Sequence, residues 1–193
     1  MERFIEEDIG DCDDSSSLVS EELEASAAII AGEECIISGL AEAVQIFQYF
    51  GLFAQPLYDD GEFVPAESAV MSIRGSARAI LQSERLALNF LGRMSGISTL
   101  TRQCVLAASG RVRIAATRKT TPGFRAWEKK AVFLGGGDSH RFNLSGAVLI
   151  KDNHIKIYGL EECLRLARQR ASFTKKIEVE VESLPDMLAA AQG

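Results

Sequence analysis

The chain has 193 residues, 47% hydrophobic and 25% charged, which is the mixture typical of a globular protein. Its length allows one large domain or two small ones, and excludes a complete (β/α)8 barrel plus a second domain, because the barrel alone takes about 250 residues. Its apolar runs are too short for a conventional membrane-spanning helix, and the cysteines at 12, 35, 104 and 163 lack metal-ligand spacing. Residues 1–10 carry four acids and no apolar segment, unlike a signal peptide, so we expect a reduced, cytoplasmic protein.

The net charge of −6 is unevenly distributed. Residues 1–70 hold 1 basic and 17 acidic residues, whereas residues 111–156 hold 10 basic and 3 acidic ones, a net charge of +7. One interpretation is solvated faces of opposite sign. The other is an anion site in the middle segment, docking against the acidic part of another copy. Nucleic acid is a poor partner, because only 7% of the residues are aromatic and few lie among the basic ones.

The first third of the chain is typical of an α+β domain. Residues 2–20 are acidic and Ser-rich and predict a loop. Residues 34–38 and 70–73 predict short strands, and residues 40–50 a helix ended by a glycine. The Asp-Gly pair at 60–61 predicts a hairpin turn between short apolar segments.

A long helical stretch follows and is a natural connector between two domains. Residues 76–90 predict one helix and residues 98–108 a second, with Gly92 and Gly96 between them.

Strands and helices then alternate, which predicts βα units and a parallel sheet. Strands are expected at 112–117, 147–150 and 176–181, and helices at 160–170 and from Pro185 onward.

Charged side chains follow each of these strands, at the end where active groups gather in parallel sheets. Glu178, Glu180 and Glu182 alternate with apolar residues and share one face, which suits either an exposed edge strand or a barrel interior. The glycines at 135–137 predict a flexible loop or, with the His-Arg pair that follows, an anion cradle. A ring of basic residues with Glu180 opposite would suit a polyanionic substrate and a bridging Mg²⁺. Its members are Arg118, Lys119, His140, Arg141 and Lys151.

Five segments in order resemble the quinolinate phosphoribosyltransferase family (nicotinate-nucleotide pyrophosphorylase, decarboxylating). They are residues 84–97 (ERLALNFLGRMSGI), 115–123 (AATRKTTPG), 135–141 (GGGDSHR), 149–154 (LIKDNH) and 178–181 (EVEV). The resemblance implies an α/β protein: an N-terminal α+β sandwich domain with connecting helices, residues 1–109, then a parallel β/α-barrel-type domain, residues 110–193. That second domain is incomplete here, with about three βα units.

The resemblance also implies a reaction in NAD biosynthesis. Quinolinate and phosphoribosyl pyrophosphate give nicotinate mononucleotide, pyrophosphate and CO₂, with Mg²⁺. The family resemblance further implies a homodimer or higher even oligomer, with neither nucleic acid nor membrane as partner.

The roles implied for single residues follow from the same resemblance. Lys119, Lys151 and Glu180 are the expected catalytic residues, with both lysines on the phosphoribosyl donor and Glu180 facing the ribose or its Mg²⁺. Arg118, His140 and Arg141 would hold quinolinate carboxylates, and Arg85 would reach the partner subunit's active site.

The sequence departs from the family pattern at several positions. Ala116 and Gly146 stand where the family has Asp, and the N-terminal EDxGxGDxT pattern is only partly kept at residues 7–13. A metal-facing Asp and a glycine-rich phosphate site of the later family strands do not occur, so we expect little activity from these residues alone. The alternatives are a non-catalytic anion-binding, dimerising fragment, a general anion-binding module, and the paralogous branch associated with molybdenum transport. That branch typically lacks the KDNH ending present at residues 151–154.

Overall fold

A computed structural model describes residues 1–192, and the chain forms two compact units, Met1–His140 and a second that begins at Arg141. The first unit contains α1 (Glu2–Ile9), the 3-10 turn η1 (Ser16–Leu18), β1 (Glu24–Ile30), β2 (Cys35–Ile36), α2 (Leu40–Tyr49), β3 (Phe53–Pro56), β4 (Phe63–Val64), β5 (Ala69–Ser76), α3 (Ala77–Ala108) and α4 (Arg125–Leu134). The second contains β6 (Val148–Ile150), α5 (Asp152–Tyr158), α6 (Leu160–Arg170), β7 (Ile177–Val179) and α7 (Leu184–Gln192). The domain boundary expected after residue 109 stays a prediction.

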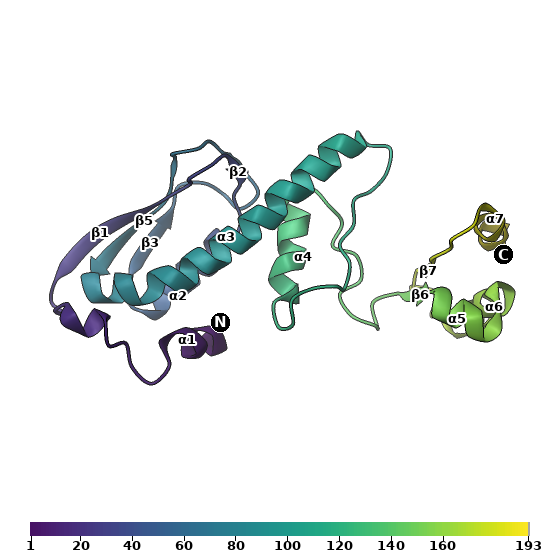
Figure 1. Cartoon of the computed structure of the whole chain (residues 1–193), viewed down its shortest axis with the longest axis horizontal. Helices are drawn as coiled ribbons and strands as arrows, with labels where there is room; N and C mark the ends of the chain where they lie inside the picture. Colours follow the sequence, from purple (N-terminus) through teal and green to yellow (C-terminus); the bar gives the residue numbers. More distant parts are fainter. Residues whose placement is uncertain (193) are drawn as a thin grey trace. The chain divides into compact units, whose positions relative to one another are not determined.

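An antiparallel sheet and two helices build the core of the first unit. The sheet has the order β1-β5-β3, with Ala27 opposite Ile73 and Ala54 opposite the same residue on the other side. Alternate residues of β1 point toward the helices and toward solvent, as a sheet covered on one face requires. Helices α2 and α3 lie along the sheet (Figure 1). Phe47 of α2 and Phe90 of α3 are buried in the hydrophobic core of this unit. The predicted α+β sandwich is therefore confirmed.

Helix α3 is continuous over 32 residues, where two helices were predicted. Gly92 and Gly96 lie inside it on its exposed side, although each glycine in a helix interior costs about 1 kcal/mol relative to alanine. Burial of Leu91 and Met94 in the same stretch of the helix compensates, because tertiary packing routinely outweighs local propensity.

The predicted loop at residues 2–20 is wrong in its first half, which forms α1. The acidic residues of α1 face solvent, and Phe4 and Ile5 pack inward. The Phe4 ring meets the rings of Phe90 and Trp127 edge-on, at centroid distances of 5.4 and 5.2 Å. These aromatic contacts outweigh the polar composition that suggested a loop.

The Asp-Gly turn forms, but the predicted hairpin does not. Strand β3, before the turn, pairs with β5, whereas β4, after it, pairs with β2. The turn places the Asp60 side chain between two helices. Its carboxylate accepts a hydrogen bond from the Leu40 N–H at 2.9 Å, at the start of α2, and forms an ion pair with Lys130 at 3.0 Å. The turn therefore ties α2 to α4 instead of joining two paired strands.

The strand predicted at 112–117 is also wrong as a strand. This segment makes an isolated parallel bridge between Ala115 and Asp138, with two backbone hydrogen bonds of 2.8 Å. The segment that contains Asp138 follows directly after the glycines at 135–137, where the chain turns. The hydrogen bonding between the two segments therefore does not continue into a strand pair. Within residues 110–192, the alternating part of the chain therefore contributes two strands and one bridge.

The second unit is a small β/α unit. Strands β6 and β7 pair in parallel, with Leu149 opposite Glu178, and helices α5 and α6 connect them. Ile150, Cys163 and Leu164 are buried in its core. The expected parallel pairing of these two strands is confirmed. Across residues 1–192, no helix is long and apolar enough to cross a membrane.

Candidate active site

Arg118 and Lys119 lie just beyond the bridged segment of the first unit. Arg118 is half-buried, and its Nε is buried without a hydrogen-bond partner among the described residues. A buried guanidinium nitrogen without an acceptor is costly, so this donor is available for an anionic group. Lys119 is exposed, and its backbone N–H donates to Thr117 Oγ1 at 3.1 Å.

The glycine-rich loop brings His140 next to that segment. The Asp138 N–H donates to the Ile114 carbonyl, and the Asp138 carbonyl accepts the Ala116 N–H, both at 2.8 Å. His140 has a left-handed backbone, φ 52°, and its N–H donates to Asp138 Oδ1 at 2.7 Å. The structure therefore ties the backbone of the His140 loop to the strand-like segment that leads to Arg118.

Sequence reasoning missed two charged residues of α4 that support these segments. Glu128 is buried, and its carboxylate accepts hydrogen bonds from Arg93 at 2.6 Å and from the Thr121 hydroxyl at 2.9 Å. Lys129 is 3% exposed, and its Nζ donates to the Ser139 carbonyl. The sequence analysis predicted no helix here, although Phe124, Trp127 and Ala131 have the apolar spacing of a helix. Nothing local in the sequence shows that Glu128 and Lys129 are also buried.

Arg85 lies on α3, where its side chain is exposed beside the buried Leu86. An exposed arginine on a helix is consistent with the expected reach toward another subunit, which remains a prediction.

Lys151 and Glu180 meet in the second unit. They follow the paired strands β6 and β7, so both stand at the carboxyl edge of the parallel pair. Lys151 Nζ lies 3.3 Å from Glu180 Oε2, with side-chain exposures of 44% and 61%. Ion pairs this exposed contribute little to stability, so the contact leaves both groups accessible to a ligand. Glu178, Glu180 and Glu182 are all exposed while the residues between them are half-buried, as the alternation predicted.

Arg141 and His154 are held by local contacts of the second unit. Arg141 Nη1 donates to the Ala147 carbonyl at 3.1 Å. A Cβ on Gly146 would lie 3.1 Å from the Arg141 Cβ, so glycine at this position lets the chain pass close to the arginine. His154 Nδ1 accepts the Lys151 N–H at 3.0 Å, which fixes the start of α5 right after the strand.

Among residues 1–192, no three His, Cys, Asp or Glu side chains lie close enough together to hold a metal ion by themselves. Mg²⁺, however, is usually held by one or two carboxylates together with substrate phosphates and water. The exposed Glu180 fits that requirement as a single protein ligand.

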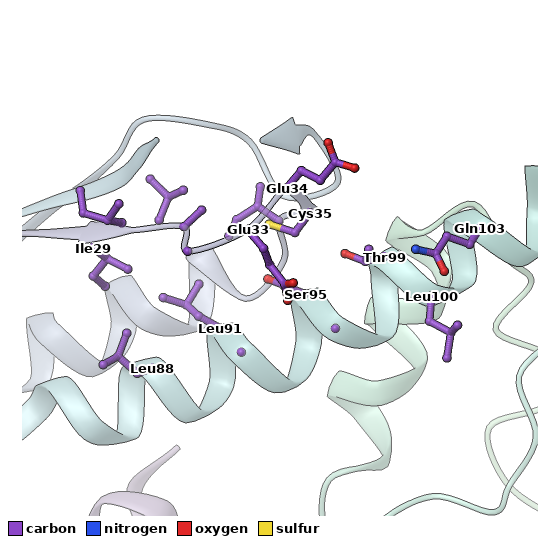
Figure 2. Close-up of a pocket in the computed structure, with 17 residues that line it drawn as sticks. Ile29, Glu33, Glu34, Cys35, Leu88, Leu91, Ser95, Thr99, Leu100 and Gln103 are labelled. Carbon is purple, nitrogen blue, oxygen red and sulfur yellow. The ribbon is translucent and has the colours of Figure 1, made fainter. Parts of the chain in front are cut away.

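A groove of about 560 Å³ in the first unit is lined by none of the predicted site residues. It runs between the loop that follows β1 and the exposed side of α3, and Glu33, Glu34, Leu88, Thr99 and Leu100 are among its lining residues (Figure 2). Its apolar floor and acidic edge do not suit a substrate with several negative charges.

Comparison with known proteins covers almost the whole chain. The family models described as the N-terminal and C-terminal domains of quinolinate phosphoribosyl transferase match residues 14–95 and 97–192. A probable nicotinate-nucleotide pyrophosphorylase [carboxylating] of Methanocaldococcus jannaschii is 42% identical, covering 100% of this chain and 69% of its own. The human nicotinate-nucleotide pyrophosphorylase [carboxylating] is 39% identical, covering 92% of this chain and 61% of its own. The crystal structure of NadC from Streptococcus pyogenes superposes with a TM-score of 0.93 at 38% identity, covering 99% of this chain and 70% of its own. The chain therefore spans about two thirds of the length of these relatives.

Proposed function

The chain belongs to the quinolinate phosphoribosyltransferase family, and we propose that it carries out the reaction of that family. The pyridine nitrogen of quinolinate attacks the anomeric carbon of phosphoribosyl pyrophosphate, and pyrophosphate leaves. The ring nitrogen becomes cationic and stabilises the electron pair that stays on the adjacent C2 when the 2-carboxylate departs as CO₂. A proton then replaces it to give nicotinate mononucleotide.

The charges of the site support this proposal. Both substrates are polyanions, and catalysis at an oxocarbenium-like centre depends on positioning and electrostatic stabilisation. The observation that carries the proposal is the pairing of Lys151 with Glu180 at the carboxyl edge of β6 and β7. This pair offers a cation for phosphate oxygens and a carboxylate for the ribose or its metal.

The remaining roles extend that proposal to the other basic residues. Arg118, His140 and Arg141 bind the two carboxylates of quinolinate, and the unpartnered Nε of Arg118 supports its part. Lys119, like Lys151, contacts the phosphoribosyl donor. When bound, Mg²⁺ neutralises pyrophosphate oxygens, with Glu180 as its protein ligand.

The protein would work as a homodimer or a higher even oligomer, with the exposed Arg85 entering the partner subunit's site. Its four cysteines are all unpaired, in keeping with a cytoplasmic location.

Quinolinate binding and turnover by residues 1–193 test the proposal directly. We expect calorimetry to detect quinolinate binding, and Arg118→Ala to weaken it at least tenfold, about 1.4 kcal/mol, because the variant removes a charged hydrogen-bond donor. The matched control is Arg111→Ala, which removes an exposed arginine from the same basic segment and should leave binding unchanged.

The same preparation is then assayed for nicotinate mononucleotide and CO₂ after adding phosphoribosyl pyrophosphate and Mg²⁺. Formation of nicotinate mononucleotide and CO₂ supports the proposed enzymatic activity. Binding without product identifies an anion-binding fragment, and unchanged binding in Arg118→Ala contradicts the carboxylate assignment.

A further inference from the structure

We propose that Lys129 is a positioning residue for the substrate site: it holds the Ser139 carbonyl and thereby fixes the left-handed backbone of His140. This inference rests on the proposed function, in which His140 binds a quinolinate carboxylate. It concerns the first unit alone, where Lys129, Ser139 and His140 all lie.

The surroundings of Lys129 are poor for a lysine that serves stability alone. The side chain is 3% exposed, and lysine is almost never buried to that degree without a paired charge. Its Nζ donates to an uncharged carbonyl, and Arg125 and Arg118 add positive charge nearby, offset in part by Asp138. Burial first, then these arginines, lower the pKa of Lys129. An apolar side chain would fill the same space at less cost.

Both polar atoms of the Ser139–His140 peptide group are held. Its carbonyl oxygen accepts the Lys129 ammonium, and its N–H donates to Asp138 Oδ1 at 2.7 Å. Asp138 is itself fixed by backbone hydrogen bonds to Ile114 and Ala116. Two anchors on opposite sides of one peptide plane prevent it from rotating.

That restraint explains the unusual backbone of His140. A φ of 52° costs a non-glycine residue roughly 1–2 kcal/mol, so it persists only where neighbours enforce it. Without Lys129, the peptide plane can rotate and His140 can return to an ordinary negative φ. The imidazole of His140 and the chain entering Arg141 would then leave the direction that binding requires.

The test uses Lys129→Met, which keeps the length of the side chain but removes the donor, and Lys129→Arg, which restores a donor. The control is Lys130→Met on the same helix, because Lys130 binds Glu42 and Asp60 instead of the loop. Hydrogen exchange of the Ala116 and His140 amides reports the loop in the absence of substrate. Calorimetry then gives the affinities for quinolinate and for phosphoribosyl pyrophosphate separately.

We expect amide exchange at His140 to be about tenfold faster in Lys129→Met, and quinolinate affinity about tenfold weaker, with phosphoribosyl pyrophosphate affinity unchanged. Lys129→Arg should recover part of both, and Lys130→Met should change neither. Unchanged exchange in Lys129→Met overturns the inference, as does an equal loss of affinity for both substrates, which would indicate a merely structural role. Failure of the unmodified chain to bind quinolinate overturns the proposed function instead, and the exchange data then decide the role of Lys129.

Discussion

Two adjacent lysines of α4 meet opposite electrostatic surroundings. Burial lowers the pKa of Lys130 as it does that of Lys129, but the carboxylates of Glu42 and Asp60 outweigh burial and raise it. Lys130 donates to Glu42 at 2.8 Å and to Asp60 at 3.0 Å, so its charge is compensated and links α4 to α2 and the Asp-Gly turn. Among the described residues, Lys129 donates to a carbonyl and its charge is offset only in part, by Asp138, which is why its burial calls for a functional explanation.

Glu128 predicts an acid-sensitive contribution to stability. Burial raises its pKa, but hydrogen bonds from Arg93 and Thr121 outweigh burial, and the pKa lies below the ordinary 4.5. A lowered folded-state pKa contributes stability above pH 4.5, which is lost as the pH falls through the folded value. We predict that Glu128→Gln lowers the free energy of unfolding at pH 7 by about 1–2 kcal/mol. It should also flatten the decline below pH 4.5.

Urea denaturation at a series of pH values measures both effects. Glu22→Gln serves as the control, because Glu22 is exposed and its loss should leave the curve in place. A decline in Glu128→Gln as steep as in the unmodified chain would show that the Arg93 and Thr121 contacts do not set this titration.

The sequence predicted residue types at the site better than their contacts. Arg118, Lys151 and Glu180 were predicted as site residues because charges that follow apolar segments are a local pattern, and their roles stay predictions. The buried Lys129 and the cap formed by His154 were missed, since each depends on a contact that forms only after folding.

At the scale of elements, the three consecutive glycines at 135–137 serve two different needs. A Cβ on Gly135 would lie 2.5 Å from the Ser98 carbonyl oxygen, and one on Gly137 would lie 2.8 Å from Val132 Cγ1. Gly136 has space, with nothing nearer than 3.9 Å, but its φ of 93° is unfavourable for other residues. Close packing of α4 against α3 and one left-handed turn together explain the run.

Glycines of α3 and of this loop should therefore respond oppositely to alanine. Gly92 and Gly96 are helical and exposed, with no atom within 4 Å of an added Cβ, so each alanine should stabilise the chain by about 0.5–1 kcal/mol. Gly135→Ala should destabilise it by about 1–3 kcal/mol, because Ser98 and Thr101 must move. Thermal and urea unfolding measure both, and a neutral Gly135→Ala would contradict the close packing seen here.

Helices and strands could be predicted where the apolar residues have a clear periodicity. They could not be predicted where the structure depends on contacts with segments far along the chain. The helix at 160–170 was predicted to the residue, because its apolar spacing is clear. The prediction of a strand at 112–117 was wrong, because the apolar pattern of a segment does not show whether a second strand pairs with it along its length. Helix α1 was not predicted, because the aromatic residues that pack against it come from α3 and α4, far along the chain.

At the scale of the whole molecule, the two units differ in how much core each can bury. The first has an extended core of side chains from the sheet and from α1 to α4, including Phe47, Met71 and Phe90. The second, among the described residues, buries four small or medium side chains: Ile150, Cys163, Leu164 and Ala167. Since hydrophobic burial is the main favourable term in folding, we expect the second unit to be the less stable one.

Limited proteolysis should therefore remove the second unit first. We predict that trypsin at low concentration cuts within residues 141–193 and leaves a resistant fragment containing residues 1–140, identified by mass spectrometry. Hydrogen exchange should agree, with β6 and β7 amides exchanging faster than those of β1 and β5. Initial cuts within the first unit would contradict this order.

The length of α3 affects the order in which its parts can fold while the chain is being synthesised. Its first half packs on α2 and the sheet, all of which precede it, and Ser98 also contacts Ser38. The hydrogen bond from Ser98 to Ala131 and the packing of Thr101 against Gly135 and Gly137 need α4 and the loop that follows it. Leu134 is made 26 residues after Ala108, an interval of about 1–5 s at ordinary translation rates. A nascent chain can therefore complete its N-terminal layers while the last turns of α3 still lack a partner. The turns that position the glycine-rich loop are then the last part of α3 to become fixed.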